Sequence, residues 1–204
     1  MQKANHTGII PAQHTGEKID TESAVECNSI AAAKSLYTLA KGRLLDINNW
    51  QHLTGRLLAG FQLVNEQGQE LNRLVQQGDY CRIDIPGPGS KSGEGYDWVQ
   101  IEAVDEVADP SIESIGIRAR PVANPQNAGS GISHFYSAQS TSNFTVTREG
   151  KKVTAGVYDR NVKPNQHTDN MVDKMRHAMA GAGAIAAFSK IQWKQLVDGL
   201  LKKD

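Results

Sequence analysis

Apolar and polar residues alternate with a period of two over several short runs in the middle of the chain. In YCRIDI (80–85), Cys81, Ile83 and Ile85 fall on one face of an extended chain, and the residues between them fall on the other. Similar runs occur in FQLVNEQGQEL (61–71), DWVQIEAV (97–104), SIGIRAR (114–120), HFYSA (134–138), NFTVTR (143–148) and KVTAGVY (152–158). Turns such as Glu149-Gly150 separate neighbouring runs. The pattern predicts about seven consecutive strands with no helix between them, and therefore an antiparallel sheet.

Helical spacing precedes these strands. Either Asn28 or Ser29 can cap a first turn. Apolar residues then recur at three- and four-residue steps, at Ile30, Ala33, Tyr37 and Ala40. Gly42 weakens this helix. A second, short helix is predicted after Asp46, and Gly55 ends it.

Helical spacing returns after the strands. Thr168 is predicted to cap a helix with an apolar stripe formed by Met171, Val172, Met175, Ala178 and Met179. Gly181 and Gly183 interrupt it. The small residues around them allow close backbone approach, so Ala182–Ala187 is a candidate surface for self-association, beside the alternative of packing within the chain.

The last helix has the clearest start signal in the chain. Ser189 and Gln192 have the spacing of a capping box, in which each side chain bonds a free backbone amide of the first turn. Phe188 and Trp193 occupy the two positions of a hydrophobic staple. The sequence therefore predicts a new helix beginning at Ser189.

The order of these elements predicts the α+β class. A strongly curved antiparallel sheet with one apolar face would be covered by two N-terminal helices and by C-terminal helices. This order resembles the helix-grip folds, in topology alone. Residues 1–27 are polar and show no period, so we expect a flexible arm with one short strand at 8–12. Residues 28–204 are long enough to form a single domain with its own core.

Charge and cysteine content narrow the class of protein. Lys and Arg together number 22, as do Asp and Glu, which argues against a general nucleic-acid or anionic-membrane surface. Cys27 and Cys81 form no CxxC pair and are expected to be reduced thiols. No apolar signal segment begins the sequence, and the apolar run 178–188 is far shorter than the roughly 20 residues that span a bilayer. We expect a cytoplasmic protein.

A glycine- and proline-rich stretch, residues 86–95, lies between two predicted strands. Phosphate-binding glycine loops deliver their amides at a helix N-terminus, and no helix follows here. Connections of this length are often functional lids. The stretch is predicted to be either a mobile lid or a passive hairpin connection.

Candidate ligand-binding residues are the polar aromatic and basic side chains of the predicted strands. Trp98, Tyr136 and Tyr158 can line an apolar cavity while offering one polar atom each, although simple core packing is the alternative. Arg118 and Arg120 share one strand face and could bind an anion, although an ordinary solvated face is the alternative. His134 could add a polar contact.

No motif in the sequence assigns catalysis. The histidines show no HxH or HExxH spacing, so no metal site or cofactor is predicted. His134 follows Ser133, but no GxSxG elbow accompanies them. Three functions remain open: a non-catalytic protein that encloses a small apolar ligand between sheet and C-terminal helix, a structural or partner-binding module, and an enzyme with a dispersed site.

Overall fold

The computed structural model describes residues 5–54, 59–85, 90, 92–165 and 182–203. Its strands are β1 (Glu17–Glu26), β2 (Gly60–Val64), β3 (Tyr80–Asp84), β4 (Asp97–Ala108), β5 (Ile112–Pro121), β6 (Thr141–Glu149) and β7 (Lys152–Val162). Its α-helices are α1 (Ile30–Leu45), α2 (Trp50–Thr54) and α4 (Ala182–Leu201), and short 3-10 turns occupy Ile47–Asn49 and Pro125–Ser130.

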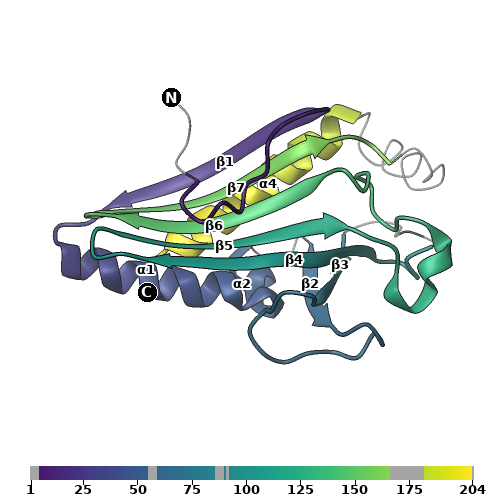
Figure 1. Ribbon diagram of the computed structural model, residues 1–204, viewed down its shortest axis with the longest axis horizontal. Coiled ribbons are helices and arrows are strands. Elements are labelled where there is room, and N and C mark those ends of the chain that lie inside the picture. The colour runs from purple at the N-terminus through teal and green to yellow at the C-terminus, as the bar shows by residue number, and fades with distance from the viewer. Residues whose placement is uncertain (1–4, 55–58, 86–89, 91, 166–181, 204) are drawn as a thin grey trace.

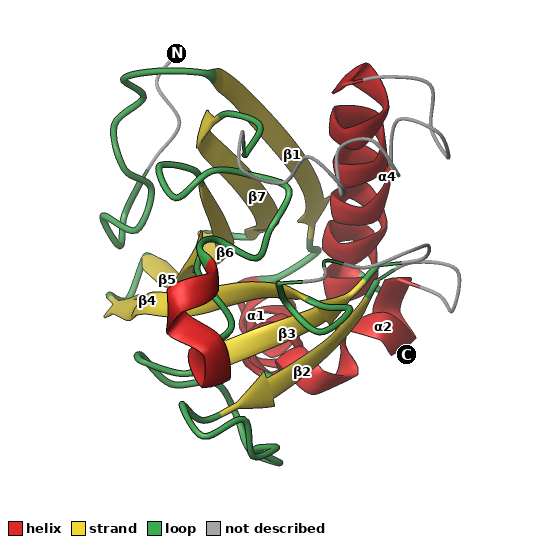
Figure 2. Cartoon of the chain, turned by 90° about the vertical axis from the view of Figure 1, so that its right-hand side faces the viewer, coloured by secondary structure: helices red, strands yellow, loops and turns green. Residues whose placement is uncertain are grey.

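The strands form one antiparallel sheet in the order β1-β7-β6-β5-β4-β3-β2, with β1 and β2 as its free edges. The sheet curves around α4, and α1 and α2 lie on the same side of it (Figures 1 and 2). Helix α4 packs against β1, β7, α1 and α2. This seven-stranded, open arrangement is a helix-grip fold and confirms the predicted α+β class.

Local signals set the first helix as the sequence predicts. The Ser29 hydroxyl accepts a hydrogen bond from the backbone N–H of Ala32 at 3.1 Å, so Ser29 is the N-cap of α1. The helix buries Ala33, Leu36, Tyr37, Ala40 and Leu44 against the sheet. It continues through Gly42 to Leu45, because packing of this apolar face outweighs the cost of one glycine.

The C-terminal end of α4 is held at two points. Arg43 of α1 donates to the backbone carbonyls of Gly199 and Leu200, each at 3.3 Å. Gly199 lies so close to α2 that an added Cβ would stand 2.7 Å from the Leu53 carbonyl oxygen. These contacts orient α4 across the concave face of the sheet.

Three strand predictions need correction. Residues 8–12, predicted to contain a short strand, form none. Residues 17–26, predicted to belong to a flexible arm, form β1, which pairs with β7 along its length. Charged edge strands lack the clear apolar alternation that identifies inner strands, and β1 is such an edge. Residues 134–138 form no strand, and a single bridge joins Tyr136 to Pro164.

The predicted helix start at Ser189 is also wrong. Helix α4 begins at Ala182 and runs through Ser189 without a break, so Ser189 and Gln192 form no capping box. The alanine-rich segment before Ser189 has a high helix propensity and extends the helix backwards. The predicted helix from Thr168 and the Phe188 side chain lie outside the described residues. So do the side chains of Ala182–Ala187.

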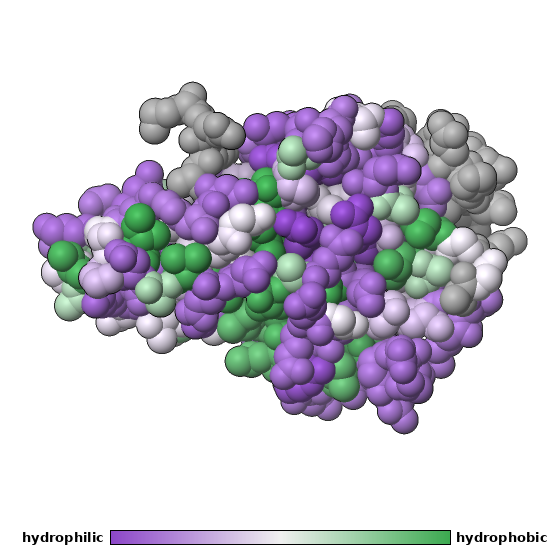
Figure 3. Space-filling model, viewed as in Figure 1, coloured by the Kyte–Doolittle hydropathy of each residue, from purple (hydrophilic) through white to green (hydrophobic). Residues whose placement is uncertain are grey.

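The face of the molecule in Figure 3 is mainly hydrophilic, with apolar residues lying between hydrophilic ones. Among the described residues, the exposed large apolar side chains are Ile30, Leu74 and Ile191. No helix in the described ranges combines the length and the apolar character needed to cross a membrane.

Candidate ligand cavity

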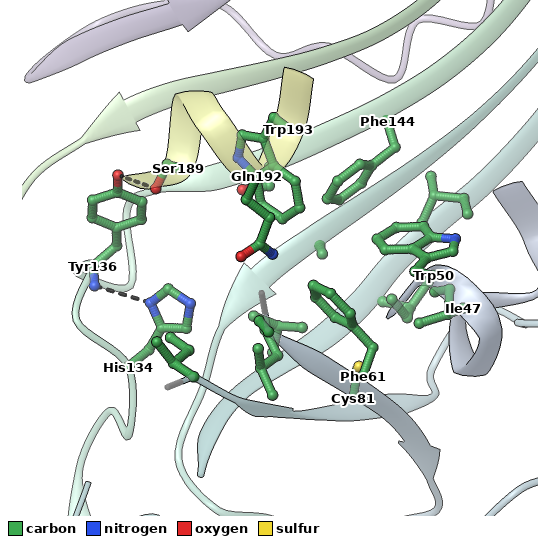
Figure 4. A pocket seen from close by; sticks show the side chains of 18 of the residues that line it. Ile47, Trp50, Phe61, Cys81, His134, Tyr136, Phe144, Ser189, Gln192 and Trp193 are labelled. Carbon is green, nitrogen blue, oxygen red and sulfur yellow. Dashed lines mark hydrogen bonds between the residues drawn. The ribbon is translucent and has the colours of Figure 1, made fainter. Parts of the chain in front are cut away.

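A cavity lies between the concave face of the sheet and α4. It is lined by Ile47, Trp50, Ala59, Phe61, Cys81, Ile83, Ile85, Val99, Ile101, Ile117, Ala119, His134, Phe135, Tyr136, Ser142, Phe144, Ser189, Gln192 and Trp193. Strands β2 to β6 contribute their inward-facing residues, because alternate side chains of a strand share one face. The segment before Tyr136 and the first described side chains of α4 close one end (Figure 4).

The volume of this cavity limits a ligand to a small molecule. The hollow, together with its opening to solvent, measures about 670 Å³, and the part that admits the centre of a water-sized sphere measures about 50 Å³. One water molecule needs about 10–15 Å³ on the second measure, so this space holds about four waters. An apolar cavity of about 150 Å³ binds benzene, so a single aromatic ring already requires small movements of the lining side chains. A larger ligand would require larger movements of these side chains.

Aromatic side chains form one wall of the cavity (Figure 4). The Trp50 ring packs on Phe61 and Phe144, with ring centroids 5.3 and 4.8 Å apart. The Trp193 ring meets Phe144 edge-on at 5.1 Å. Such contacts bury a large apolar area and hold the rings in fixed orientations.

Polar atoms gather at the opposite end. The Tyr136 hydroxyl and the Ser189 hydroxyl lie 3.2 Å apart. The backbone N–H of Tyr136 donates to Nδ1 of His134 at 2.9 Å. Gln192 enters the same region from α4 (Figure 4). A few convergent polar groups in an apolar enclosure are typical of a small-molecule site.

The cavity carries no formal charge. None of the described residues that line it is Asp, Glu, Lys or Arg. Burial lowers the pKa of His134 to about 3, which keeps the imidazole neutral. Burial also raises the pKa of the Cys81 thiol to about 12 and raises that of the Tyr136 phenol, so both stay protonated at neutral pH.

One ionisable group lies just behind the wall. Asp159 of β7 is buried and accepts a hydrogen bond from the Trp193 indole N–H at 3.2 Å. Burial raises the pKa of this carboxyl to about 6, although hydrogen bonds from Ser142 and Trp193 and the charge of Arg160 oppose the rise.

Of the candidates named from the sequence, the cavity brings together His134 and Tyr136. Trp98, Tyr158 and Arg118 do not line it, which corrects the expectation of a shared wall. The strand alternation already held the signal: each of these three residues alternates with inward-facing neighbours and therefore faces the other side of the sheet.

These three residues have other contacts on that side. The Trp98 indole N–H donates to the Gly93 carbonyl at 3.0 Å. The Tyr158 hydroxyl donates to Glu22 of β1 at 2.5 Å. The Arg118 guanidinium donates to the Ile9 carbonyl at 2.7 Å and so holds the N-terminal segment against β5. All three contacts tie neighbouring segments together.

Part of the glycine-rich stretch lies next to Trp98. The backbone N–H groups of Gly93 and Gly95 donate to the Ser90 carbonyl at 3.2 and 2.7 Å, which makes a tight turn. Residues 86–89 and Lys91 lie outside the described residues. Whether the stretch acts as a lid or as a passive connection stays a prediction.

Sequence reasoning missed the part of the site that α4 supplies. If a helix started at Ser189, a capping box would account for Ser189 and Gln192, and a hydrophobic staple would account for Trp193. Within a continuous helix, the same three- and four-residue spacing places them on one face with the buried Leu196 and Leu200. That shared face was the available signal.

The described residues contain no group of three His, Cys, Asp or Glu side chains that could hold a metal ion. Cys27 and Cys81 are both buried, and neither forms a disulfide with the other. The arrangement therefore offers hydrogen bonds and apolar contacts to a ligand.

Solved structures of similar fold include three from different organisms. Hypothetical protein jhp0584 from Helicobacter pylori matches 98% of this chain over 97% of its own length, with 11% sequence identity and a TM-score of 0.52. Major latex-like protein 151 from Panax ginseng matches 91% of this chain over 98% of its own, with 9% identity and a TM-score of 0.39. Truncated norcoclaurine synthase from Thalictrum flavum matches 96% of this chain over 100% of its own length, with 11% identity and a TM-score of 0.37.

No protein-family model and no curated protein matches the sequence. The likeness to the Helicobacter pylori protein, at 11% identity, is one of fold alone, and the two lower TM-scores support nothing further. The chain thus shares its fold, and little of its sequence, with these structures.

Proposed function

We propose that this chain is a non-catalytic binding protein that encloses a small apolar ligand between its sheet and α4. The observation that carries the proposal is the uncharged cavity, which has an aromatic wall at one end and polar atoms at the other. Transfer of an apolar molecule from water into such a space is favourable, at about 25 cal/mol per Å² of apolar surface buried.

The contacts of Ser189 and His134 favour binding over nucleophilic catalysis. A serine nucleophile requires a general base within hydrogen-bond reach. The Ser189 hydroxyl pairs with the Tyr136 phenol, which remains protonated, and Nδ1 of His134 accepts from the backbone N–H of Tyr136. Neither contact gives Ser189 a base.

Native mass spectrometry of the purified chain is the first test, because it reports retained ligand and oligomeric state together. We expect one retained small molecule per chain, or uptake of added p-xylene, an apolar probe of single-ring size. A second measurement follows p-xylene binding by calorimetry.

A matched pair of variants locates the binding. Ala119 lines the cavity on β5, so Ala119→Leu should fill it and weaken p-xylene binding at least about tenfold. Ala24→Leu makes the same change at an exposed position of β1 and should leave binding unchanged. Equal affinity of both variants, each folded by circular dichroism, would place the ligand elsewhere and overturn the proposal.

A further inference from the structure

One buried polar atom in the cavity has no partner. Gln192 is 4% exposed, and its Oε1 accepts no hydrogen bond from the described residues. The other buried side-chain atoms that lack a hydrogen-bond partner among the described residues belong to Tyr37, Asp97, Asn124, Asn143 and Asp159. None of these five residues lines the cavity. A buried acceptor left unpaired is costly, so its presence in a cavity points to a partner supplied from outside.

His134 lines the same cavity and supplies a donor to it. Nδ1 of His134 accepts from the backbone N–H of Tyr136, so a neutral ring must carry its proton on Nε2. Figure 4 shows the second ring nitrogen of His134 on the side of the Gln192 amide, which reaches toward it from α4. The two groups make no hydrogen bond with each other, since Oε1 has no partner. A donor and an acceptor thus face a shared space.

We propose that His134 and Gln192 together bind the hydroxyl group of an uncharged, otherwise apolar ligand. The hydroxyl oxygen accepts from His134 Nε2–H, and its proton is donated to Gln192 Oε1. A hydroxyl satisfies both groups because it is donor and acceptor at once. This inference rests on the proposed function and adds the class of ligand to it.

Charged head groups fit this pair less well. A carboxylate has no proton to give Gln192 Oε1 and meets no Lys or Arg among the described lining residues. An ammonium has no lone pair for His134 Nε2–H. Both ions would also lose their hydration in an apolar enclosure, which is unfavourable without a counter-charge. A methyl group in place of the hydroxyl leaves both protein groups unpaired.

Three single-ring probes of related shape test the inference by calorimetry at neutral pH: p-cresol, p-xylene and p-toluate. We expect p-cresol to bind at least about fivefold more tightly than p-xylene, since its hydroxyl forms two buried hydrogen bonds that the methyl group cannot form. We expect p-toluate to bind more weakly than either.

Variants of α4 supply the control. Gln192→Leu should bind p-xylene at least as well as the unmodified chain and should lose most of its preference for p-cresol. Gln195→Leu, an exposed position on the same helix, should keep the full preference. Thermal denaturation of both variants checks that each is folded.

The outcomes separate the two proposals. If p-cresol and p-xylene bind equally to the unmodified chain, water alone bridges His134 and Gln192, and this inference is overturned while the binding function stands. If the preference survives in Gln192→Leu, the hydroxyl site lies elsewhere, and this inference also fails. If no probe binds, the proposed function fails and this inference with it.

Discussion

Arg148 on β6 and Gln192 on α4 are both polar and both buried, yet their surroundings differ. The Arg148 guanidinium donates to Glu113 at 2.5 Å and to the carbonyls of Pro110 and Gly150 at 3.1 and 3.0 Å. The side-chain amide oxygen of Gln192, Oε1, has no hydrogen-bond partner among the described residues. A buried polar group whose hydrogen bonds are all made holds the fold together, whereas one left open in a cavity is available to a ligand.

The largest expected effect comes from the paired side of this comparison. Arg148→Met removes a buried cation and leaves Glu113 and two carbonyls without their donor, so the free energy of unfolding should fall by about 3–5 kcal/mol. Arg82→Met removes a more exposed pair with Glu70 and should cost at most about 1 kcal/mol. Urea denaturation of both variants measures the difference. Equal losses would contradict a structural role specific to Arg148.

The next effect concerns Asp159, whose pKa rises from 3.8 to about 6 in the folded chain. Between these two pH values the folded state holds a proton that the unfolded state has released, so stability falls as pH rises. Asp159→Asn should therefore unfold with a free energy up to about 3 kcal/mol higher than the unmodified chain at pH 7. The gain should shrink to about 0.5 kcal/mol at pH 4 and nearly disappear at pH 3, where both states are protonated.

Chemical denaturation at pH 3, 4, 5, 6 and 7 follows this difference. Groups other than Asp159 contribute to both chains alike and largely cancel in the comparison. A gain that is the same at every pH would show that ionisation of Asp159 does not cause it.

A smaller effect comes from the unpaired side. Gln192→Leu removes a buried acceptor without a partner and should raise the free energy of unfolding by about 1–3 kcal/mol in the absence of ligand. Gln195→Leu, at an exposed position, should change it by less than about 0.5 kcal/mol. A loss of stability in Gln192→Leu would mean that the amide is paired in the free protein.

The smallest effect tests the role of Ser189. If Ser189 stabilises the fold through its hydrogen bond to Tyr136, Ser189→Ala should lower the free energy of unfolding by about 0.5–1.5 kcal/mol. The double variant with Tyr136→Phe should then lose less than the sum of the two single losses. As a helix cap, Ser189 would contribute about 1 kcal/mol independently of Tyr136. The double-mutant cycle separates the two roles where the single variant cannot.

The sequence by itself determined the elements that depend on local chemistry. Alternation identified β3 to β7, Ser29 identified the start of α1, and Glu149-Gly150 identified the turn between β6 and β7. Consecutive strands with no helix between them leave only antiparallel pairing, so the α+β class followed. The same alternation also carries the signal that Trp98, Arg118 and Tyr158 face away from the cavity, although they were predicted to bind a ligand there.

Only the tertiary structure decided which polar groups meet in the cavity. His134 and Gln192 are far apart in the chain, and they come together because α4 crosses the concave face of a curved sheet. A periodic pattern records which residues share a face but not what that face meets. Burial by the sheet and α4 leaves Oε1 of Gln192 without a hydrogen-bond partner and raises the pKa of Asp159. Neither effect exists before the sheet closes over the helix.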